Sequence, residues 1–164
     1  LADADGARLF IADTGHHRVL VAGFDGQVRE AIGSGRPGLQ DGGFDEAAFH
    51  APQGLAVEGD TLYVADTENH CIRRVDLRAR RVERVAGTGE QARLARRRGP
   101  ALSTLLSSPW DLALRDGTLA IANAGTHQLW ELDLAAGELR RFAGTGREAL
   151  YDDKIGRASC RERV

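Results

Sequence analysis

Short apolar runs alternate along the chain with clusters of glycine, aspartate and asparagine, and this pattern predicts short β-strands. Residues 54–57 are apolar, and the glycine and aspartate of residues 58–60 are typical of a hairpin turn. Residues 62–65 predict a second strand. Residues 71–75 and 81–85 then alternate apolar and charged positions, as half-buried strands do. Since no window keeps a helical spacing of apolar residues for about 10 positions, this stretch predicts four antiparallel strands.

The same pattern occurs three times, at a spacing of about 55 residues. Each copy has an apolar strand that ends in a short polar residue, then a histidine, a second strand and a glycine-rich closing turn. These strand-and-histidine segments are residues 9–19, 62–72 and 119–129, and the closing turns are residues 32–35, 86–89 and 143–146. Residues 52–57 and 109–114 share a further signature that begins with proline. Self-similarity of this kind indicates a repeat architecture.

Four short strands per repeat with glycine-rich turns describe one blade of a β-propeller, in which each twisted sheet packs against its neighbours. The sequence therefore predicts an all-β fold, a partial propeller of about three four-stranded blades. We expect the blades at about residues 1–35, 51–90 and 108–147, with the first blade incomplete. The inner strands are expected near residues 54–57 and 111–114.

Residues 63–73, Tyr-Val-Ala-Asp-Thr-Glu-Asn-His-Cys-Ile-Arg, resemble the NHL repeat. The first and third copies depart from it in places, for example with Asn123 where Asp66 stands, but all three keep the histidine. The whole pattern also resembles the propeller of thioredoxin-fold proteins that carry NHL repeats. The resemblance implies a six-bladed ring, which at this spacing needs about 330 residues, and a covalently linked thioredoxin-like domain outside this chain.

The last residues match no part of the repeat. Residues 154–164 continue neither the spacing nor any strand alternation, and residues 155–164 resemble one reading frame of a common sequencing adapter. We therefore expect a propeller fragment at residues 1–153 and a non-native tail at residues 154–164. The chain begins with leucine and contains no methionine, which suggests that the natural N-terminus is missing. With Cys160 assigned to the tail, Cys71 is the single natural cysteine and no disulfide framework is expected.

Composition narrows the function classes. The formal net charge of −2 lacks the basic footprint of a dedicated nucleic-acid binder. No apolar stretch approaches the roughly 18 residues of a membrane helix, so no membrane partner is expected. A single thiol does not indicate a compartment, and the location stays unknown with a slight preference for the cytoplasm.

Two sets of polar residues recur once per blade. One set lies where the second strand ends, and its side chains are expected to accept hydrogen bonds from backbone N–H groups of the following turn: Asp13, Asp66 and Asn123. The other set is expected to form structural hydrogen bonds between strands or blades, or alternatively to bind a ligand or a metal: His17, His70 and His127. We favour the structural interpretation and expect neither a metal nor another cofactor. The metal-binding lyases among NHL-like propellers use histidines near the channel, and the inner-strand starts carry none.

The connections between blades are long for a compact β domain, and long loops are often functional. Residues 36–51 and 90–108 are expected to gather at one propeller face, with Phe49 and Leu106 packed beneath them. Trp110 starts an inner strand, where it either packs in the core or borders the central channel and stacks on a ligand.

The second blade is rich in arginine, and most of these side chains are expected to be solvated at a strand edge. An acidic partner and an RNA are the alternatives, although the stretch lacks aromatic residues for base stacking. The arginines are Arg73, Arg74, Arg78, Arg80, Arg81, Arg84, Arg93 and Arg96–Arg98.

Since no nucleophile and base stand in a convincing arrangement, the sequence favours a non-catalytic scaffold that binds a protein or small ligand at a propeller face. No catalytic residue is assigned, and enzymatic activity is left open. The first alternative is a fragment of a metal-dependent propeller lyase or hydrolase, and the second is an RNA-binding NHL domain.

Overall fold

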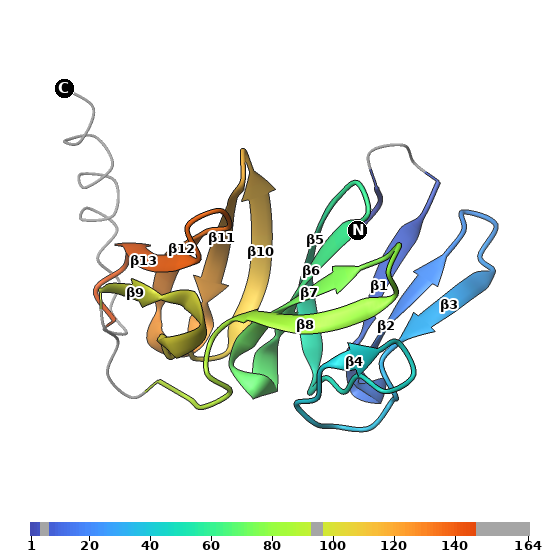
Figure 1. Cartoon of the computed structure of the whole chain (residues 1–164), viewed down its shortest axis with the longest axis horizontal. Coiled ribbons are helices and arrows are strands. Elements are labelled where there is room, and N and C mark those ends of the chain that lie inside the picture. The colour runs from blue at the N-terminus through green and yellow to red at the C-terminus, as the bar shows by residue number, and fades with distance from the viewer. Residues whose placement is uncertain (4–6, 93–96, 147–164) are drawn as a thin grey trace.

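A computed structural model describes residues 1–3, 7–92 and 97–146, and it contains three antiparallel sheets that stand side by side in chain order (Figure 1). The first sheet has three strands: β1 (Leu9–Asp13), β2 (Arg18–Ala22) and β3 (Val28–Ile32). Ala2 forms an isolated bridge with Leu9 beside β1. The fold class is thus confirmed as an all-β partial propeller, while residues 154–164 lie outside the described residues.

The second and third sheets repeat one four-stranded meander. The second consists of β5 (Pro52–Glu58), β6 (Thr61–Asp66), β7 (Cys71–Asp76) and β8 (Arg81–Ala86). The third consists of β10 (Pro109–Arg115), β11 (Thr118–Asn123), β12 (Gln128–Asp133) and β13 (Glu138–Ala143). The inner strands β5 and β10 contain the ranges that the sequence predicts for them.

A fifth short strand joins each complete blade, which the four-strand prediction did not include. β4 (Gly42–Gly43) pairs with the outer strand β8, and β9 (Arg98–Pro100) pairs with the outer strand β13. Both come from the connection that precedes the blade. The connections thus reach the outer edge of the blade that follows them, and each covers an edge that would otherwise be open.

Short 3₁₀ turns connect the strands: η1 (Thr14–His16), η2 (Thr67–Asn69), η3 (Ala101–Ser103) and η4 (Ala124–Thr126). Among the described residues, no helix has the length and apolar character needed to cross a membrane.

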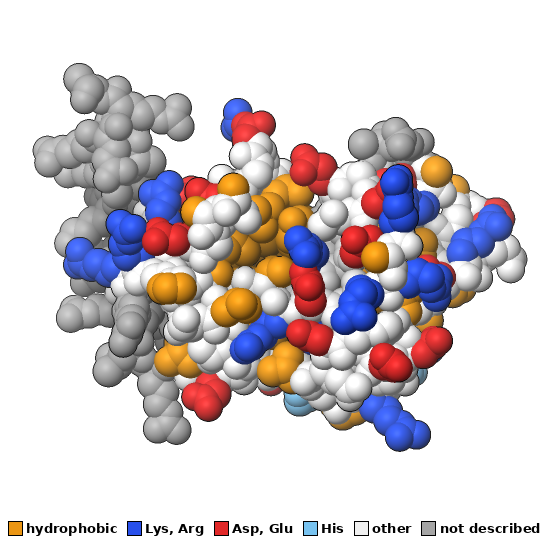
Figure 2. All heavy atoms as spheres, in the orientation of Figure 1, with side chains coloured by type: hydrophobic (Ala, Val, Ile, Leu, Met, Phe, Trp, Pro, Cys, Tyr) orange, Lys and Arg blue, Asp and Glu red, His pale blue; other side chains and the backbone are white. Residues whose placement is uncertain are grey.

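Two hydrophobic clusters join the sheets, and each contains side chains from a connection as well as from two blades. The cluster between the first two blades contains Phe10, Val19, Val21, Ile32, Leu62, Val64, Val75 and Val82, with Phe44, Ala47 and Phe49 from the connection. The cluster between the second and third blades contains Tyr63, Ala65, Ile72, Ala86, Leu112, Leu119, Ile121, Trp130, Leu132 and Leu139, with Ala101 and Leu106 from the connection. Hydrophobic side chains are also visible at the surface around β10 (Figure 2).

The middle blade is buried on both faces because it stands between two others. In β6, Leu62 and Val64 contribute to the first cluster, and the alternate residues Tyr63 and Ala65 contribute to the second. A strand that is buried on both faces loses the simple inside–outside alternation of a surface strand. This explains why the sequence of β6 is a nearly continuous apolar run.

The inner strands of adjacent blades approach most closely at Gly54. A Cβ atom at this position would lie 2.5 Å from Asp111 Cα and 2.7 Å from the Trp110 carbonyl oxygen. Only glycine therefore lets β5 and β10 converge at this point without a backbone shift.

Candidate functional site

The repeated histidine owes its position to the turn that precedes it. In each blade the second strand runs into a 3₁₀ turn, and the chain leaves that turn through a left-handed residue. This residue is His17 with φ 53°, His70 with φ 51° and His127 with φ 50°. The left-handed backbone reverses the chain into the third strand and places the imidazole at the end of the blade.

Two of the three histidines fasten one blade to the next. Backbone N–H groups donate to histidine Nδ1 atoms, from Ala51 to His17 at 3.1 Å and from Ser108 to His70 at 3.1 Å. Each donor precedes the proline that starts the inner strand of the following blade. Since Nδ1 must be unprotonated to accept this bond, burial acts in the same direction when it lowers the pKa of His70.

In the first two blades a threonine makes a further hydrogen bond to the next blade. Thr14 Oγ1 donates to the Pro52 carbonyl at 2.7 Å, and Thr67 Oγ1 donates to the Pro109 carbonyl at 2.8 Å. We call the histidine and threonine bonds together the blade clasp. In the third blade Ala124 stands at the threonine position, so the clasp lacks its hydroxyl there.

The expectation that Asp13, Asp66 and Asn123 cap the following turn is wrong, because none makes a side-chain cap bond to it. Asp66 Oδ1 accepts from the His50 N–H at 2.7 Å, and Asn123 Oδ1 accepts from the Ser107 N–H at 2.8 Å. These N–H groups belong to the connection before the blade. The side chains thus satisfy buried backbone groups of the connection.

Asp13 differs in that its side chain bonds to other side chains and accepts from no backbone N–H group among the described residues. Its carboxylate contacts His16 Nδ1 at 2.7 Å and accepts from Arg18 Nε at 2.8 Å. Hydrogen bonds from His16 and Arg18 lower the pKa of Asp13. The first blade therefore lacks the bond from a connection that its counterparts Asp66 and Asn123 receive among the described residues.

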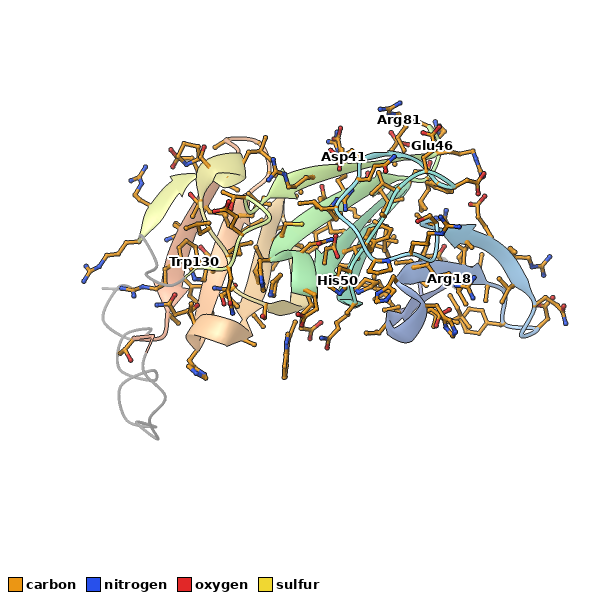
Figure 3. The ribbon with its side chains drawn as sticks, turned by 90° about the horizontal axis from the view of Figure 1, so that it is seen from below. Arg18, Asp41, Glu46, His50, Arg81 and Trp130 are labelled. Atoms are coloured by element: carbon orange, nitrogen blue, oxygen red, sulfur yellow. The ribbon has the colours of Figure 1, made fainter. Side chains whose placement is uncertain are left out.

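Arg73 is fully buried, and it is an exception to the expectation that most arginines of this blade are solvated, since Arg74, Arg78, Arg80 and Arg81 are exposed. The Arg73 guanidinium donates to Asp66 at 3.0 Å, to Asp41 at 2.6 Å and to the Ala48 carbonyl at 2.9 Å. It also lies 5.2 Å from the centre of the Phe49 ring. Both Asp41 and Ala48 belong to the connection, so Arg73 ties that segment to β7; Figure 3 labels Asp41 and, on the same segment, His50.

Most of the other described arginines of this blade have local partners. Arg74 pairs with Glu83, Arg78 with Asp60 and Arg80 with Glu30, and Arg84 donates to the Gly87 carbonyl. Arg93 and Arg96 lie outside the described residues. Nearby carboxylates therefore offset much of the positive charge that the sequence displays.

Cys71 is buried beside this network, with its Sγ atom 3.9 Å from Asp66 Oδ2. Burial raises the pKa of the thiol far above its ordinary range. A thiol held in its neutral form is a poor nucleophile. The residue thus acts as a small core side chain.

A pocket of about 650 Å³ is lined mainly by residues of the third blade, together with Glu68 of the second. It brings together three residues that the sequence singles out, Trp110, Asn123 and His127, whereas His17 and His70 lie elsewhere, in the clasps. The remaining lining residues are Glu68, Ser108, Ala122, Ala124, Gly125, Gln128, Leu129, Ala143 and Gly144.

Trp110 points outward because of a bulge in its strand. The register of β10 against β11 shifts between Pro109 and Asp111, so Trp110 has no partner in this ladder. A bulge re-aims the side chain of the extra residue, and Trp110 is 56% exposed. The alternative that Trp110 packs in the core is wrong. Trp130, labelled in Figure 3, is the fully buried tryptophan and donates to Gln128 Oε1 at 3.1 Å.

The histidines do not converge on a common centre. His17 packs edge-to-face on His50, with ring centres 5.3 Å apart, while His70 and His127 belong to separate blade ends. Within residues 1–3, 7–92 and 97–146, no group of three histidine, cysteine or acidic side chains is arranged to hold a metal ion.

Sequence reasoning did not select Glu68 or Leu129 for the site. Glu68 follows a clasp threonine, and Leu129 occupies the repeat position of the buried Val19 and Ile72. Leu129 stands out only when the exposure of the three copies is compared. It is 42% exposed, while its two counterparts are fully buried.

Comparison with known proteins identifies the repeat. A family model described as the NHL repeat matches residues 49–75. The chain is 45% identical over 172 residues to NHL repeat-containing protein 2 of Bos taurus, covering 91% of this chain and 24% of that protein. It is 42% identical over 146 residues to the chloroplastic protein SUPPRESSOR OF QUENCHING 1 of Arabidopsis thaliana, covering 86% of this chain and 14% of that protein.

A solved structure shares the fold. A structural genomics protein from Bacteroides thetaiotaomicron superposes with a TM-score of 0.66 at 25% identity, covering 82% of this chain and 32% of that one. The chain spans about a quarter of the length of the NHL repeat-containing relative from Bos taurus.

Proposed function

We propose, on the premise that this chain is built from NHL repeats folded as propeller blades, that it is a non-catalytic scaffold for binding a protein. In this proposal the blades provide the frame, and the surface around the exposed Trp110 provides the binding site. The clasps and the two apolar clusters hold the frame, so the partner meets a surface that is already formed.

The exposure of Trp110 is the observation that carries this proposal. Its indole is 56% exposed at the rim of the pocket, on a strand that is bonded to β11 and fastened to the second blade through Thr67. An exposed tryptophan on a rigid element is the kind of residue that dominates binding energy at protein interfaces. Its strand loses little conformational freedom when a partner binds.

The lining favours a peptide over a nucleic acid. Glu68 adds a carboxylate to the pocket lining that also contains Trp110. A negative charge at this point repels phosphate groups, whereas peptide recognition combines apolar contacts with a few polar groups.

A peptide library displayed on phage and selected on the full chain tests this proposal. We expect the selected peptides to lose at least about tenfold in affinity for W110A. Gln53 is the matched control, because it is the exposed residue at the same repeat position in the second blade. Binding that is equal in the wild type, Q53A and W110A places the partner elsewhere and contradicts the proposal.

We also propose that the full protein joins these blades to a thioredoxin-like domain and closes a six-bladed ring. The support is the resemblance of the repeat pattern to thioredoxin-fold proteins with NHL repeats. Sequencing the complete transcript tests both points, and it also decides whether residues 154–164 are encoded by the gene. A transcript with no thioredoxin-like segment contradicts the domain proposal.

A further inference from the structure

We infer that Glu68 and Trp110 together bind an arginine side chain of the partner, with the guanidinium stacked on the indole and paired with the carboxylate. This inference rests on the proposed binding function of the surface around Trp110 and specifies what that surface recognises. The site lies at the junction between the second and third blades, where both residues line one pocket.

A hydrogen bond between their neighbours in the chain holds the two residues side by side. Thr67 Oγ1 donates to the Pro109 carbonyl at 2.8 Å. Glu68 directly follows Thr67, and Trp110 directly follows Pro109. The blade clasp thus brings a carboxylate of η2 next to an indole of β10, although these residues are 42 positions apart in the sequence.

The turn that carries Glu68 is fixed by further hydrogen bonds. The Glu68 N–H donates to the His50 carbonyl at 3.1 Å, and Asn69 Nδ2 donates to the Gly38 carbonyl at 2.7 Å. Both acceptors belong to the connection before the blade. A carboxylate on a backbone held in this way is positioned before the ligand arrives, so its turn loses little conformational freedom on binding.

Both side chains are exposed and available to a ligand. Within the described ranges 1–3, 7–92 and 97–146, no arginine or histidine forms an ion pair with the Glu68 carboxylate, and the Trp110 indole N–H donates to no acceptor. A guanidinium suits this pair because it donates to a carboxylate as a planar fork and also stacks on an aromatic face. A lysine ammonium is a compact charge that offers no such plane.

The junction between the first and second blades has the same bond but neither of these side chains. Thr14 Oγ1 donates to the Pro52 carbonyl at 2.7 Å, and the residues that follow are Gly15 and Gln53. Since this clasp forms without them, an acid and a tryptophan are not needed to join two blades. Gln53 is exposed although its blade has a neighbour on each side, so this repeat position stays accessible between blades.

A blocked peptide with one arginine between glycines tests the inference, in comparison with the same peptide containing lysine or citrulline, the neutral isostere of arginine. Titration into the full chain is followed by the NMR signal of the Trp110 indole N–H, which W110Q lacks. The signal of the buried Trp130 should not move. We expect the arginine peptide to bind with a dissociation constant of about 10 mM or lower, the citrulline peptide at least about fivefold more weakly, and the lysine peptide about twofold more weakly.

E68Q provides the test on the protein side, because it removes the charge of an exposed side chain and keeps its shape. It should weaken binding of the arginine peptide at least about fivefold and remove the preference for arginine over citrulline. E58Q is the matched control, since Glu58 is an exposed carboxylate at the other end of β5 and its loss changes the net charge equally. E58Q should bind within about twofold of the wild type.

Three results overturn the inference. The first is equal affinity for the arginine and citrulline peptides, or a dissociation constant above about 10 mM for the arginine peptide. The second is equal affinity of E68Q and E58Q for the arginine peptide, because any attraction is then one of net charge alone. The third is tighter binding of the lysine peptide than of the arginine peptide. If peptides selected from the phage library lose affinity for W110A but not for E68Q, the proposed function holds and only the inference fails.

Discussion

The imidazole at the end of each 3₁₀ turn combines two properties that rarely coincide in one residue. Histidine tolerates the left-handed backbone better than a β-branched residue does, and its neutral ring offers an acceptor for an N–H group of the next blade. His70 uses both properties. Protonation of His70 removes the acceptor, so this contact makes the joint between the second and third blades sensitive to acid.

The pH dependence of stability should therefore be smaller in H70N than in the wild type. Burial lowers the pKa of His70 from its ordinary value of 6.5, so the folded chain binds the proton less readily than the unfolded chain. The contribution of His70 to the free energy of unfolding is then present above pH 6.5 and is lost as the pH falls through the lowered value. Urea unfolding of both chains at about pH 7.5 and about pH 5 measures the difference.

H127N is the matched control for that measurement. His127 has the same repeat position and nearly the same φ, but no N–H group of the described residues donates to its ring. The pH dependence of H127N should equal that of the wild type. If H70N and H127N behave alike, the bond from Ser108 does not link stability to pH.

The Cys71 thiol should not react in the native chain. It is fully buried, and its raised pKa leaves almost no thiolate at neutral pH. The variant C160S leaves Cys71 as the single cysteine, so a chromogenic disulfide reagent reports on it alone. We expect labelling only after denaturant is added. Rapid labelling of the native variant would show that β7 is accessible.

At the scale of elements, the connection before a blade is a structural part of it. Residues 36–51 supply the outer strand β4, the buried Phe49 and partners for Arg73. The Arg73–Asp66 pair is fully buried, so removing either side chain leaves the charge of the other in the interior without its opposite charge in the pair. Burial raises the pKa of Asp66, and the donors Asn69, His50 and Arg73 oppose that change.

D66N and R73L should each lower the free energy of unfolding by about 3 kcal/mol, because each removes one charge of a fully buried ion pair and leaves the other charge in the interior. The replacements follow the chain itself, since Asn123 and Leu20 occupy these positions in other blades. The double variant should lose at least about 1 kcal/mol less than the sum of the single losses. Denaturant unfolding of the four chains measures this coupling, and strict additivity would mean that the two side chains do not interact.

The repeat made the strands predictable from the sequence. The role of the connections could not be predicted. Alternation along residues 71–75 and 81–85 identifies β7 and β8, and the same spacing locates their counterparts in the third blade. The pattern gives no sign of β4, since Gly42 and Gly43 have no side chains to alternate. The burial of Arg73 could not be predicted, because charge normally indicates exposure. Its partners Asp41 and Ala48 lie 32 and 25 residues away, in a segment without periodicity.

The candidate site was predictable only in part for a similar reason. Trp110 and His127 stand out by residue type and repeat position, and both line the pocket. Leu129 looks like any other strand residue until the burial of all three copies is compared. Whether a repeated position is open or covered depends on the neighbouring blade, and a single copy of the repeat does not contain that information.

At the scale of the whole molecule, the blades are held at a fixed angle by the close approach of their inner strands. G54A should lower the free energy of unfolding by about 1–3 kcal/mol, because its methyl group would meet the backbone of Asp111. Gly15 is the control, since a Cβ atom there has no neighbour within 4 Å, and G15A should stay within about 0.5 kcal/mol of the wild type. Thermal or urea unfolding of both variants measures this, and equal stability would show that the inner strands separate easily.

The fifth strand of each blade has a consequence for how such a chain can grow by gene duplication. Residues 36–51 complete the sheet that follows them, and their Phe49 packs against the sheet that precedes them. The smallest segment that can be copied and inserted as a working part is therefore a connection together with its blade. A breakpoint just before Arg36 or Glu90 preserves that unit, whereas a breakpoint at Pro52 or Pro109 separates a sheet from its own edge strand.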